Sequence, residues 1–153
     1  MHKGEILGIY GLMGAGRSEL VNILFGLDEY ESGQIIFKGK EMKKQSPIER
    51  IRAGMGYITE NRKEEGLFLE FSVAENVNIA NLKTLSKSGV VNKKKALENA
   101  EDAKKMFSIK CEAVNKHLVK GLSGGNQQKV VIAKWVSTKP ELLIVDEPTR
   151  RCV

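Results

Sequence analysis

The sequence is poor in cysteine, with two in 153 residues, and this scarcity excludes a disulfide framework as the basis of the fold. Cys111 and Cys152 are far apart and match no metal-ligand spacing, which predicts a reducing compartment. No apolar run approaches a membrane span and no secretory signal is recognisable, so we expect a soluble chain. His2 and His117 are isolated, and we assign neither a role. The length suits one domain, and a hydrophobic content of 41% is consistent with a folded one.

Positive charge is in excess, with a formal net charge of +6. Much of it is lysine between residues 83 and 110, where lysines alternate with apolar residues at helical spacing. This pattern predicts the solvated face of an amphipathic helix. Nucleic-acid binding is the alternative, but neither an aromatic stacking surface nor a base-reading module accompanies the charge, so we expect no nucleic-acid partner. Contact with the anionic lipids of a membrane surface stays open.

Strands and helices alternate along the chain, which predicts an α/β fold with a parallel core sheet. The predicted strands cover residues 5–10, 34–37, 56–59 and 142–146. The predicted helices cover residues 18–26, 47–53, 72–82, 93–108 and 123–138. The pairs Ser46 with Glu49 and Ser72 with Glu75 are typical of capping boxes, and Gly26 of a helix C-cap. Residues 68–122 are predicted to form a helical insert, with residues 1–67 and 123–153 forming the core subdomain.

A glycine-rich loop follows the first predicted strand, and residues 11–18 read Gly-Leu-Met-Gly-Ala-Gly-Arg-Ser. Its glycines allow positive φ angles and bring backbone N–H groups close to a phosphate chain, and the next helix adds the positive end of its dipole. The predicted phosphate ligands are Gly11, Gly14, Ala15, Gly16, Arg17 and Ser18, and the Ser18 hydroxyl is also a predicted Mg²⁺ ligand. Arg17 replaces the lysine of the pattern, and the two are not interchangeable, so hydrolysis is expected to suffer more than binding. A glycine-rich turn without a ligand is the alternative.

Two other motifs fit these glycines less well. A dinucleotide-binding fold needs G-x-G-x-x-G, whereas the loop reads G-x-x-G-x-G, and no acidic residue follows residues 34–37 to bind a ribose. Residues 121–125 satisfy the G-x-S-x-G pattern of α/β-hydrolases, but a polar stretch precedes them and no histidine follows to complete a triad. Both interpretations are therefore weak.

Two acidic residues follow the most apolar predicted strand. Residues 142–145 are four apolar residues in a row, which predicts a central strand buried on both faces. Asp146 falls at the carboxyl end of that strand, where ligands bind in parallel α/β sheets, and is predicted to bind Mg²⁺. Glu147 is the predicted catalytic residue, polarising the water that attacks a γ-phosphate. An acidic turn after a core strand is the alternative.

Three segments in this order, residues 11–18, 122–129 and 142–149, resemble the nucleotide-binding domain of an ATP-binding cassette (ABC) transporter. The match runs from Gly4 to Arg150 and is most similar to the second of two such domains in tandem ATP-binding proteins of simple-sugar importers, of the ribose, galactose and xylose type. Arg17 is typical of that second domain. Residues 57–63, followed by Gly66 and Leu67, resemble its acidic replacement for the usual glutamine loop, with Glu60 as the acidic residue.

The resemblance implies a P-loop NTPase fold that binds ATP and Mg²⁺ and faces a second nucleotide-binding domain head to tail. Each ATP then lies between one domain's phosphate loop and the other's signature, here residues 122–129 with the predicted ligands Ser123, Gly124, Gly125 and Gln127. The helix that begins there exposes N–H groups suited to a γ-phosphate. The chain's own site, with Arg17 and Glu60, is expected to be the slower of the two.

The resemblance also implies transmembrane permease subunits as partners and a peripheral position at the cytoplasmic face of the cell membrane. The loop at residues 60–67 and the helical insert are expected to touch the permease, with Phe68, Phe71 and Val73 as candidate contacts; a place in the ordinary core is the alternative for each of the three.

Compared with the family, an adenine-stacking aromatic region before Met1 and a strand after Thr149 are missing. That strand normally lies between the phosphate-loop strand and the strand before Asp146, so we expect a gap in the sheet. The chain is therefore expected to be a fragment, incomplete at both ends and inactive alone. Two hypotheses follow: part of the energy-coupling ATPase of a carbohydrate importer, or a non-catalytic nucleotide-binding or dimerisation module.

Overall fold

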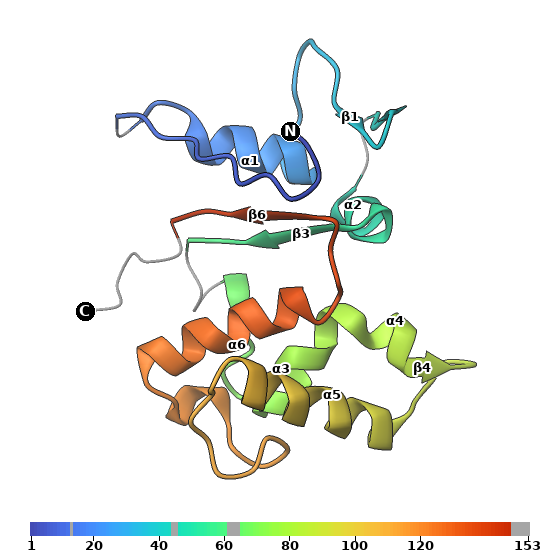
Figure 1. The fold of residues 1–153 in the computed structure, drawn as a ribbon, viewed down its shortest axis with the longest axis vertical. Helices are drawn as coiled ribbons and strands as arrows, with labels where there is room; N and C mark the ends of the chain where they lie inside the picture. The colour runs from blue at the N-terminus through green and yellow to red at the C-terminus, as the bar shows by residue number, and fades with distance from the viewer. Residues whose placement is uncertain (13, 44–45, 61–64, 148–153) are drawn as a thin grey trace. The chain divides into compact units, whose positions relative to one another are not determined.

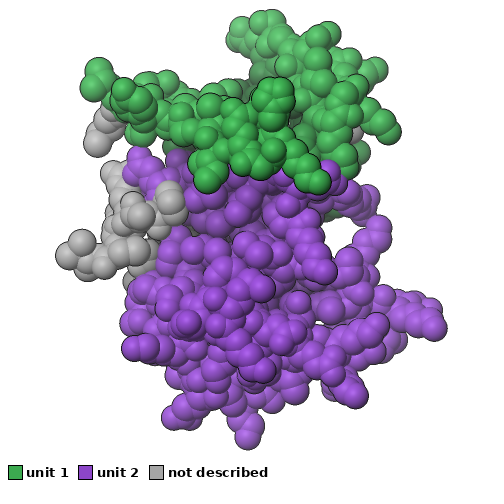
Figure 2. All heavy atoms as spheres, viewed as in Figure 1, with its two compact units in different colours: residues 1–50 green, residues 51–153 purple. Residues whose placement is uncertain are grey.

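The computed structural model describes residues 1–12, 14–43, 46–60 and 65–147. The chain forms two compact units, Met1–Arg50 and Ile51–Val153, which Figure 2 colours separately. The first unit carries the glycine-rich loop, and the second carries the parallel sheet and most of the helices.

Helix α1 (Arg17–Phe25) is bounded by a glycine at each end. Gly16 and Gly26 have left-handed backbone angles, with φ of 77° and 84°, a conformation that glycine adopts at no steric cost. Across the turn at Gly26, the Leu27 N–H donates to the Asn22 carbonyl at 2.9 Å, which satisfies one of the last free carbonyls of the helix. The predicted C-cap is therefore confirmed.

Residues 5–10 do not form the predicted strand. Their side chains are all exposed, with Ile6 at 98% and Tyr10 at 95%. A strand exists by pairing its backbone with a neighbour, and no described residue forms a ladder with this segment. The strand prediction is wrong because an apolar pattern reports the tendency to pair and not the presence of a partner.

Two short antiparallel hairpins are present, and the first contains the second half of the strand predicted at residues 34–37. In the first, β1 (Ile36–Phe37) pairs with β2 (Lys40–Glu41), and in the second, β4 (Ser86–Lys87) pairs with β5 (Val90–Val91). The two central residues of each turn have positive φ, between 51° and 80°, as in a type I′ turn. In each turn the second central residue is a glycine, which lowers the steric cost of that conformation.

The parallel core sheet consists of β3 (Met55–Ile58) and β6 (Leu142–Val145), which run side by side in Figure 1. All four residues of β3 are buried, whereas in β6 Ile144 is buried and Val145 is 42% exposed. The prediction that residues 142–145 are buried on both faces is thus wrong in part. Within the described residues β6 has a strand on one side only, so it lacks the neighbours that would cover its side chains on the other.

A helical layer packs against β3 and forms the main hydrophobic core. Helix α3 (Val73–Asn78) contacts both α5 (Lys93–Met106) and α6 (Gly124–Val136), as Figure 1 shows. The completely buried residues of this core include Val73, Val77, Ala100, Val130 and Val131. The predicted helix at residues 72–82 is present but changes to a 3₁₀ helix at residue 79. The helices after residue 46 are α2 (Pro47–Ala53), α3 (Val73–Asn78), the 3₁₀ helix η2 (Ile79–Asn81), α4 (Leu82–Leu85), α5 (Lys93–Met106), the 3₁₀ helix η3 (Val119–Gly121) and α6 (Gly124–Val136).

Local signals at the helix ends behave as predicted. Ser72 Oγ accepts from the Glu75 N–H at 3.3 Å, and the Glu75 carboxylate accepts from the Ser72 N–H at 2.8 Å, which completes a capping box. The Ser72 hydroxyl also donates to the Glu75 carboxylate at 2.6 Å, and this bond, together with the one from the Ser72 N–H, lowers the pKa of Glu75. At α2, the Glu49 carboxylate accepts from the Ser46 N–H at 2.8 Å, one half of the predicted box.

The lysine-rich helix α5 is amphipathic, as predicted. Its first three residues, Lys93, Lys94 and Lys95, are exposed, whereas Ala100 and Ala103 are buried. None of the helices in the described part of the chain has both the length and the apolarity needed to cross a membrane.

Candidate nucleotide-binding site

The glycine-rich loop in the first unit is a tight turn that leads into α1. Gly14 has a φ of 80°, and with Gly16 it confirms the expected left-handed positions, whereas Gly11 is not at positive φ. Gly11 serves a different need, because a Cβ there would lie 3.3 Å from the Ala15 Cβ. The Ala15 N–H donates to the Leu12 carbonyl at 3.1 Å and closes the turn. Residue 13 lies outside the described residues.

The first turn of α1 offers backbone donors to an anion. Gly16 is the N-cap and has no side chain with which to cap the helix, so no side-chain cap bonds to the first N–H groups. Arg17 and Ser18 are the first two helical residues; Arg17 is half-buried and Ser18 is exposed. This arrangement fits phosphate binding by the N–H groups of the turn and the positive end of the helix dipole.

Three carboxylates follow the ends of the two parallel strands of the second unit. Ile58 lies opposite Val145, and the Asp146 N–H donates to the Ile58 carbonyl at 2.8 Å, so the ladder extends just beyond both strands. Glu60 and Asp146 therefore emerge at the same edge of the sheet, with Glu147 next to Asp146. Asp146 and Glu147 are half-buried, and Glu60 is exposed.

These carboxylates suit a cation that is shared with a phosphate. Among the described residues, no group of three histidine, cysteine or acidic side chains is close enough to hold a metal ion. Mg²⁺ is usually bound by one or two protein oxygens together with substrate phosphates, and not by an all-protein cage. In the second unit, the half-buried Asp146 is an oxygen ligand of the kind that such a cation takes.

Glu147 has an uncommon backbone conformation, with a φ of 41°. A non-glycine residue in the left-handed region carries a steric cost and often occurs at functional sites. The conformation follows directly on the strand end at Val145, so it turns the chain away from the sheet direction after Asp146.

The signature segment forms the exposed start of α6. Ser123 is the N-cap with extended backbone angles, and Ser123 and Gly125 are exposed. A Cβ placed on Gly125 would meet no atom within 4 Å, so the space in front of this turn is open. Asn126, which the sequence interpretation does not single out, donates to Ser123 Oγ at 3.0 Å and accepts from the Lys110 N–H at 2.9 Å. This asparagine therefore fixes the orientation of the serine hydroxyl. The sequence feature that could have identified it is its position just after two glycines at the start of a helix.

Two predicted contact residues are buried. Gln127 is 5% exposed, and its Nε2 donates to the Val119 carbonyl at 3.2 Å, so its side chain supports the segment before the signature. Val73 is completely buried, which contradicts its selection as a surface contact, because its side chain fills the core beside α6. Phe68 and Phe71 are 49% and 43% exposed and stack with their ring centroids 5.3 Å apart.

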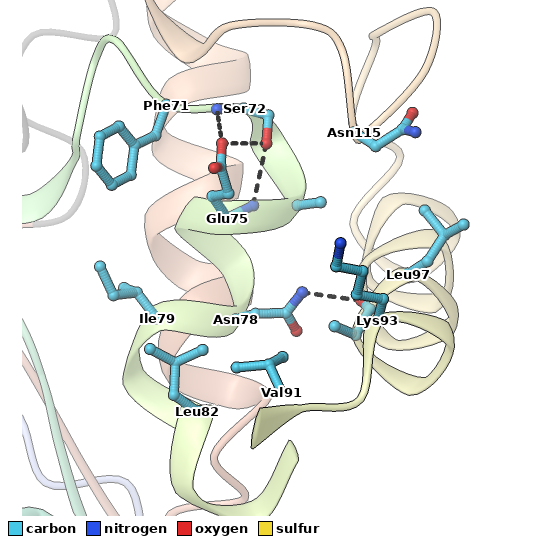
Figure 3. A pocket seen from close by; sticks show the side chains of 12 residues that line it. Phe71, Ser72, Glu75, Asn78, Ile79, Leu82, Val91, Lys93, Leu97 and Asn115 are labelled. Carbon is cyan, nitrogen blue, oxygen red and sulfur yellow. Dashed lines mark hydrogen bonds between the residues drawn. The ribbon is translucent and has the colours of Figure 1, made fainter. Parts of the chain in front are cut away.

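A cavity of about 650 Å³ lies beside Phe71, between α3 and α5 (Figure 3). Ile79, Leu82, Val91 and Leu97 give it a largely apolar lining. Asn78 spans its base, because its Nδ2 donates to the Ala96 carbonyl at 2.8 Å and its Oδ1 accepts from Asn99 at 2.8 Å.

The chain is similar to known proteins along almost its whole length. The family model described as "ABC transporter" matches residues 1–150. The ribose import ATP-binding protein RbsA of Bacillus cereus (strain ATCC 14579) is 49% identical over 150 residues, and that of Bacillus subtilis (strain 168) is 46% identical over 150 residues. Each alignment covers 98% of this chain and 30% of the relative, so the chain spans about 30% of the length of these curated proteins.

Solved structures share the fold. The dimeric structure of MJ0796, a bacterial ABC transporter cassette, has a TM-score of 0.75 at 23% identity and covers 93% of this chain and 60% of that one. A post-hydrolysis state of the same cassette, bound to ADP and Pi, has a TM-score of 0.73 at 24% identity, covering 90% and 58%. The predicted α/β fold of the P-loop NTPase type is confirmed.

Proposed function

Because this chain belongs to the ABC transporter family, we propose that it is part of the ATP-binding, energy-coupling subunit of a carbohydrate importer. The observation that carries the proposal is its similarity to ribose import ATP-binding proteins along almost its whole length. The exposed loop at residues 11–18 and the exposed start of α6 support it, since both present helix N-termini to an anion.

In the proposed function, the loop glycines supply backbone N–H groups to the phosphates, and Arg17 pairs with phosphate oxygens. Ala15 lies in the same loop and shapes it, because its own N–H donates to the Leu12 carbonyl. Mg²⁺, when bound, neutralises phosphate charge during transfer. The Ser18 hydroxyl and the Asp146 carboxylate are its proposed ligands. Glu147 accepts a hydrogen bond from the attacking water and orients it, while Glu60, at the same sheet edge, lies where it influences that water or the cation.

The start of α6 serves the nucleotide of a second nucleotide-binding domain. Ser123, Gly124 and Gly125 offer a hydroxyl, free N–H groups and open space to an incoming phosphate. Gln127 acts from beneath by holding the Val119 carbonyl. The resulting pair of sites is asymmetric, because the site built on Arg17 lacks the compact lysine charge.

Permease subunits are the second proposed partner, with the chain peripheral at the cytoplasmic face of the membrane. We assign residues 68–122 to a helical insert and residues 1–67 and 123–153 to the core subdomain. Phe71 lines an apolar cavity (Figure 3), and its ring stacks on that of Phe68. These two exposed rings give the insert a face suited to an apolar partner segment.

The alternative function is a non-catalytic module that binds nucleotide or pairs with a complete domain. Arg17 and Glu60 favour it, since both depart from the residues that hydrolytic sites use. ATP turnover by the full-length protein separates the two functions, because the alternative predicts binding without turnover at this site.

The test of the proposed function is MgATP binding to this chain, followed with a fluorescent ATP analogue while circular dichroism confirms folding. We expect saturable binding that Ser18→Ala weakens about tenfold or more, because the hydroxyl contact to the cation is lost. Ser32→Ala is the matched control, an exposed serine outside the loop, and should leave the affinity unchanged. Equal affinities for wild type and Ser18→Ala would contradict the loop as the phosphate site.

A further inference from the structure

Helix α6 carries a lysine on its core-facing side. Gln127, Val130, Val131 and Lys134 follow one another at helical spacing and are all buried, Lys134 being 6% exposed. Burial of the ammonium lowers the pKa of Lys134 to about 8. An apolar side chain would pack at this position without the cost of desolvating a charge, so the lysine needs a reason beyond packing.

The ammonium has one hydrogen-bond partner among the described residues. Lys134 Nζ donates to the Gly66 carbonyl at 2.6 Å, across 68 positions of sequence, and it lies 5.3 Å from the centroid of the Trp135 ring. Gly66 and Leu67 are buried and end the segment that begins at the sheet edge with Glu60. The bond therefore joins α6, the helix that begins at the signature, to Gly66, which follows Glu60 in the sequence.

Other lysines of the chain hold carbonyls or carboxylates from the surface. Lys104 Nζ donates to the Glu112 carbonyl at 2.8 Å in an exposed contact, and Lys120 pairs with Glu70 in solvent. Such exposed contacts contribute little, because water competes for the same groups. The bond from Lys134 is charge-assisted like theirs, but it differs from them because it is buried and shielded from water.

We propose that Lys134 is a positioning residue that fixes Gly66, which follows Glu60 in the sequence, to α6, so that the helix that begins at the signature also restrains the chain after Glu60. The inference rests on the proposed function, in which Glu60 serves this chain's own nucleotide and Ser123 serves the partner's. The bond thereby links the two nucleotide sites through a single helix of 13 residues.

Within the part of the chain that the structure describes, no acid forms an ion pair with Lys134, and burial is the cause of its lowered pKa. The described titratable groups on α3, on β3 and next to Gly66 include Glu75, which is bonded to Ser72, Tyr57 and the exposed Glu65. The strength of the bond therefore changes with the proton on Lys134 itself.

The first experiment is amide hydrogen exchange of residues 65–69 in this chain at pH 7. Lys134→Met removes the donor, and we expect exchange in this segment to become about tenfold faster or more, while Lys104→Met, which removes an exposed lysine-to-carbonyl bond, leaves it unchanged. Equal exchange in wild type and Lys134→Met would overturn the proposal.

The second experiment needs no variant and covers the case in which Lys134→Met does not fold. Trp135 is the only tryptophan, so its fluorescence reports the proton on the neighbouring ammonium. We expect an emission change in wild type with a midpoint near pH 8, accompanied by a lower protection factor at residues 65–69, that is, exchange that accelerates more than the intrinsic rate does with pH. An emission and a protection factor that both stay constant through this range would overturn the proposal.

The third experiment measures ATP turnover of the full-length protein. Lys134→Met should lower kcat severalfold with little change in KM, because the loop carrying Glu60 is misplaced while the glycine loop is intact; Lys134→Arg, which keeps charge and donors, should restore part of it. An unchanged kcat overturns the role of the bond in turnover. Absence of turnover in wild type counts against the proposed function alone, since the exchange result stands without it.

Discussion

Asn76 is completely buried on α3, and its side-chain amide holds the turn before that helix. Its Oδ1 accepts from the Phe68 N–H at 2.8 Å, and its Nδ2 donates to the carbonyls of Phe68 at 2.9 Å and Ser72 at 3.0 Å. We predict that Asn76→Ala destabilises the second unit strongly, although Asn76 is none of the predicted nucleotide ligands.

The magnitude depends on which backbone groups lose their only partner. The Phe68 carbonyl still accepts from the Phe71 N–H at 3.0 Å, and the Ser72 carbonyl from the Asn76 N–H at 3.1 Å. The Phe68 N–H alone is left without a bond, which costs about 1–2 kcal/mol for a buried donor. The space vacated by the amide adds about 1 kcal/mol, so we expect a loss of about 2–3 kcal/mol in the free energy of unfolding.

Urea unfolding followed by Trp135 fluorescence measures this loss, because the single tryptophan lies in the same unit. Asn115→Ala is the matched control; this exposed asparagine should change the free energy of unfolding by less than about 0.5 kcal/mol. A loss below about 1 kcal/mol for Asn76→Ala would refute the reasoning, since it would mean that water or another group satisfies the Phe68 N–H.

Asn76→Asp separates the acceptor from the donor. The carboxylate keeps the acceptor for the Phe68 N–H but sets a buried charge against two carbonyl oxygens, so the folded state favours the protonated form and its pKa rises above about 3.9. Stability relative to wild type should therefore fall as pH rises through that higher pKa and recover on acidification. A cost that does not vary with pH would contradict this account.

Two further predictions concern α6. Relative to Lys134→Met, the free energy of unfolding of wild type should rise by about 2 kcal/mol between pH 7 and pH 9.5, because the folded lysine loses its proton near pH 8 and the unfolded one at 10.5. Urea titrations of both proteins at each pH measure this difference in free energy, and a difference that falls or stays constant would contradict the lowered pKa. Gly125→Ala should leave that free energy unchanged, since its Cβ meets open space, while reducing ATP turnover of the full-length protein at least tenfold; a fully active variant would show that no phosphate approaches this turn.

Features encoded in a few neighbouring residues follow from the sequence. The capping box at Ser72, the glycine that ends α1 and the lysine face of α5 depend on contacts within one or two helical turns, so their residue types suffice to predict them. Strand 5–10 and the burial of β6 depend on which strands lie alongside, and an apolar run carries no information about that.

The candidate site divides in the same way. The loop glycines and the acidic residues after β6 are predicted by type and spacing, and Gly14 and Gly16 have the expected backbone. The burial of Gln127 and Val73 and the bond from Lys134 to Gly66 depend on which face of a helix meets the core. For Lys134 the sequence does contain a signal, because it falls at helical spacing after the apolar Val130 and Val131, on the side of the helix that they predict to face the core.

Because Glu147 has a left-handed backbone, selection for stability and selection for activity should favour different residues at this position. A glutamate held at a φ of 41° costs the fold about 1 kcal/mol that glycine would avoid and asparagine would reduce. A library of variants at this position, sorted for heat resistance alone, should therefore enrich glycine or asparagine. Sorting the same library for growth on the imported sugar should retain glutamate, so the two enrichments measure how much stability is given up for the carboxylate.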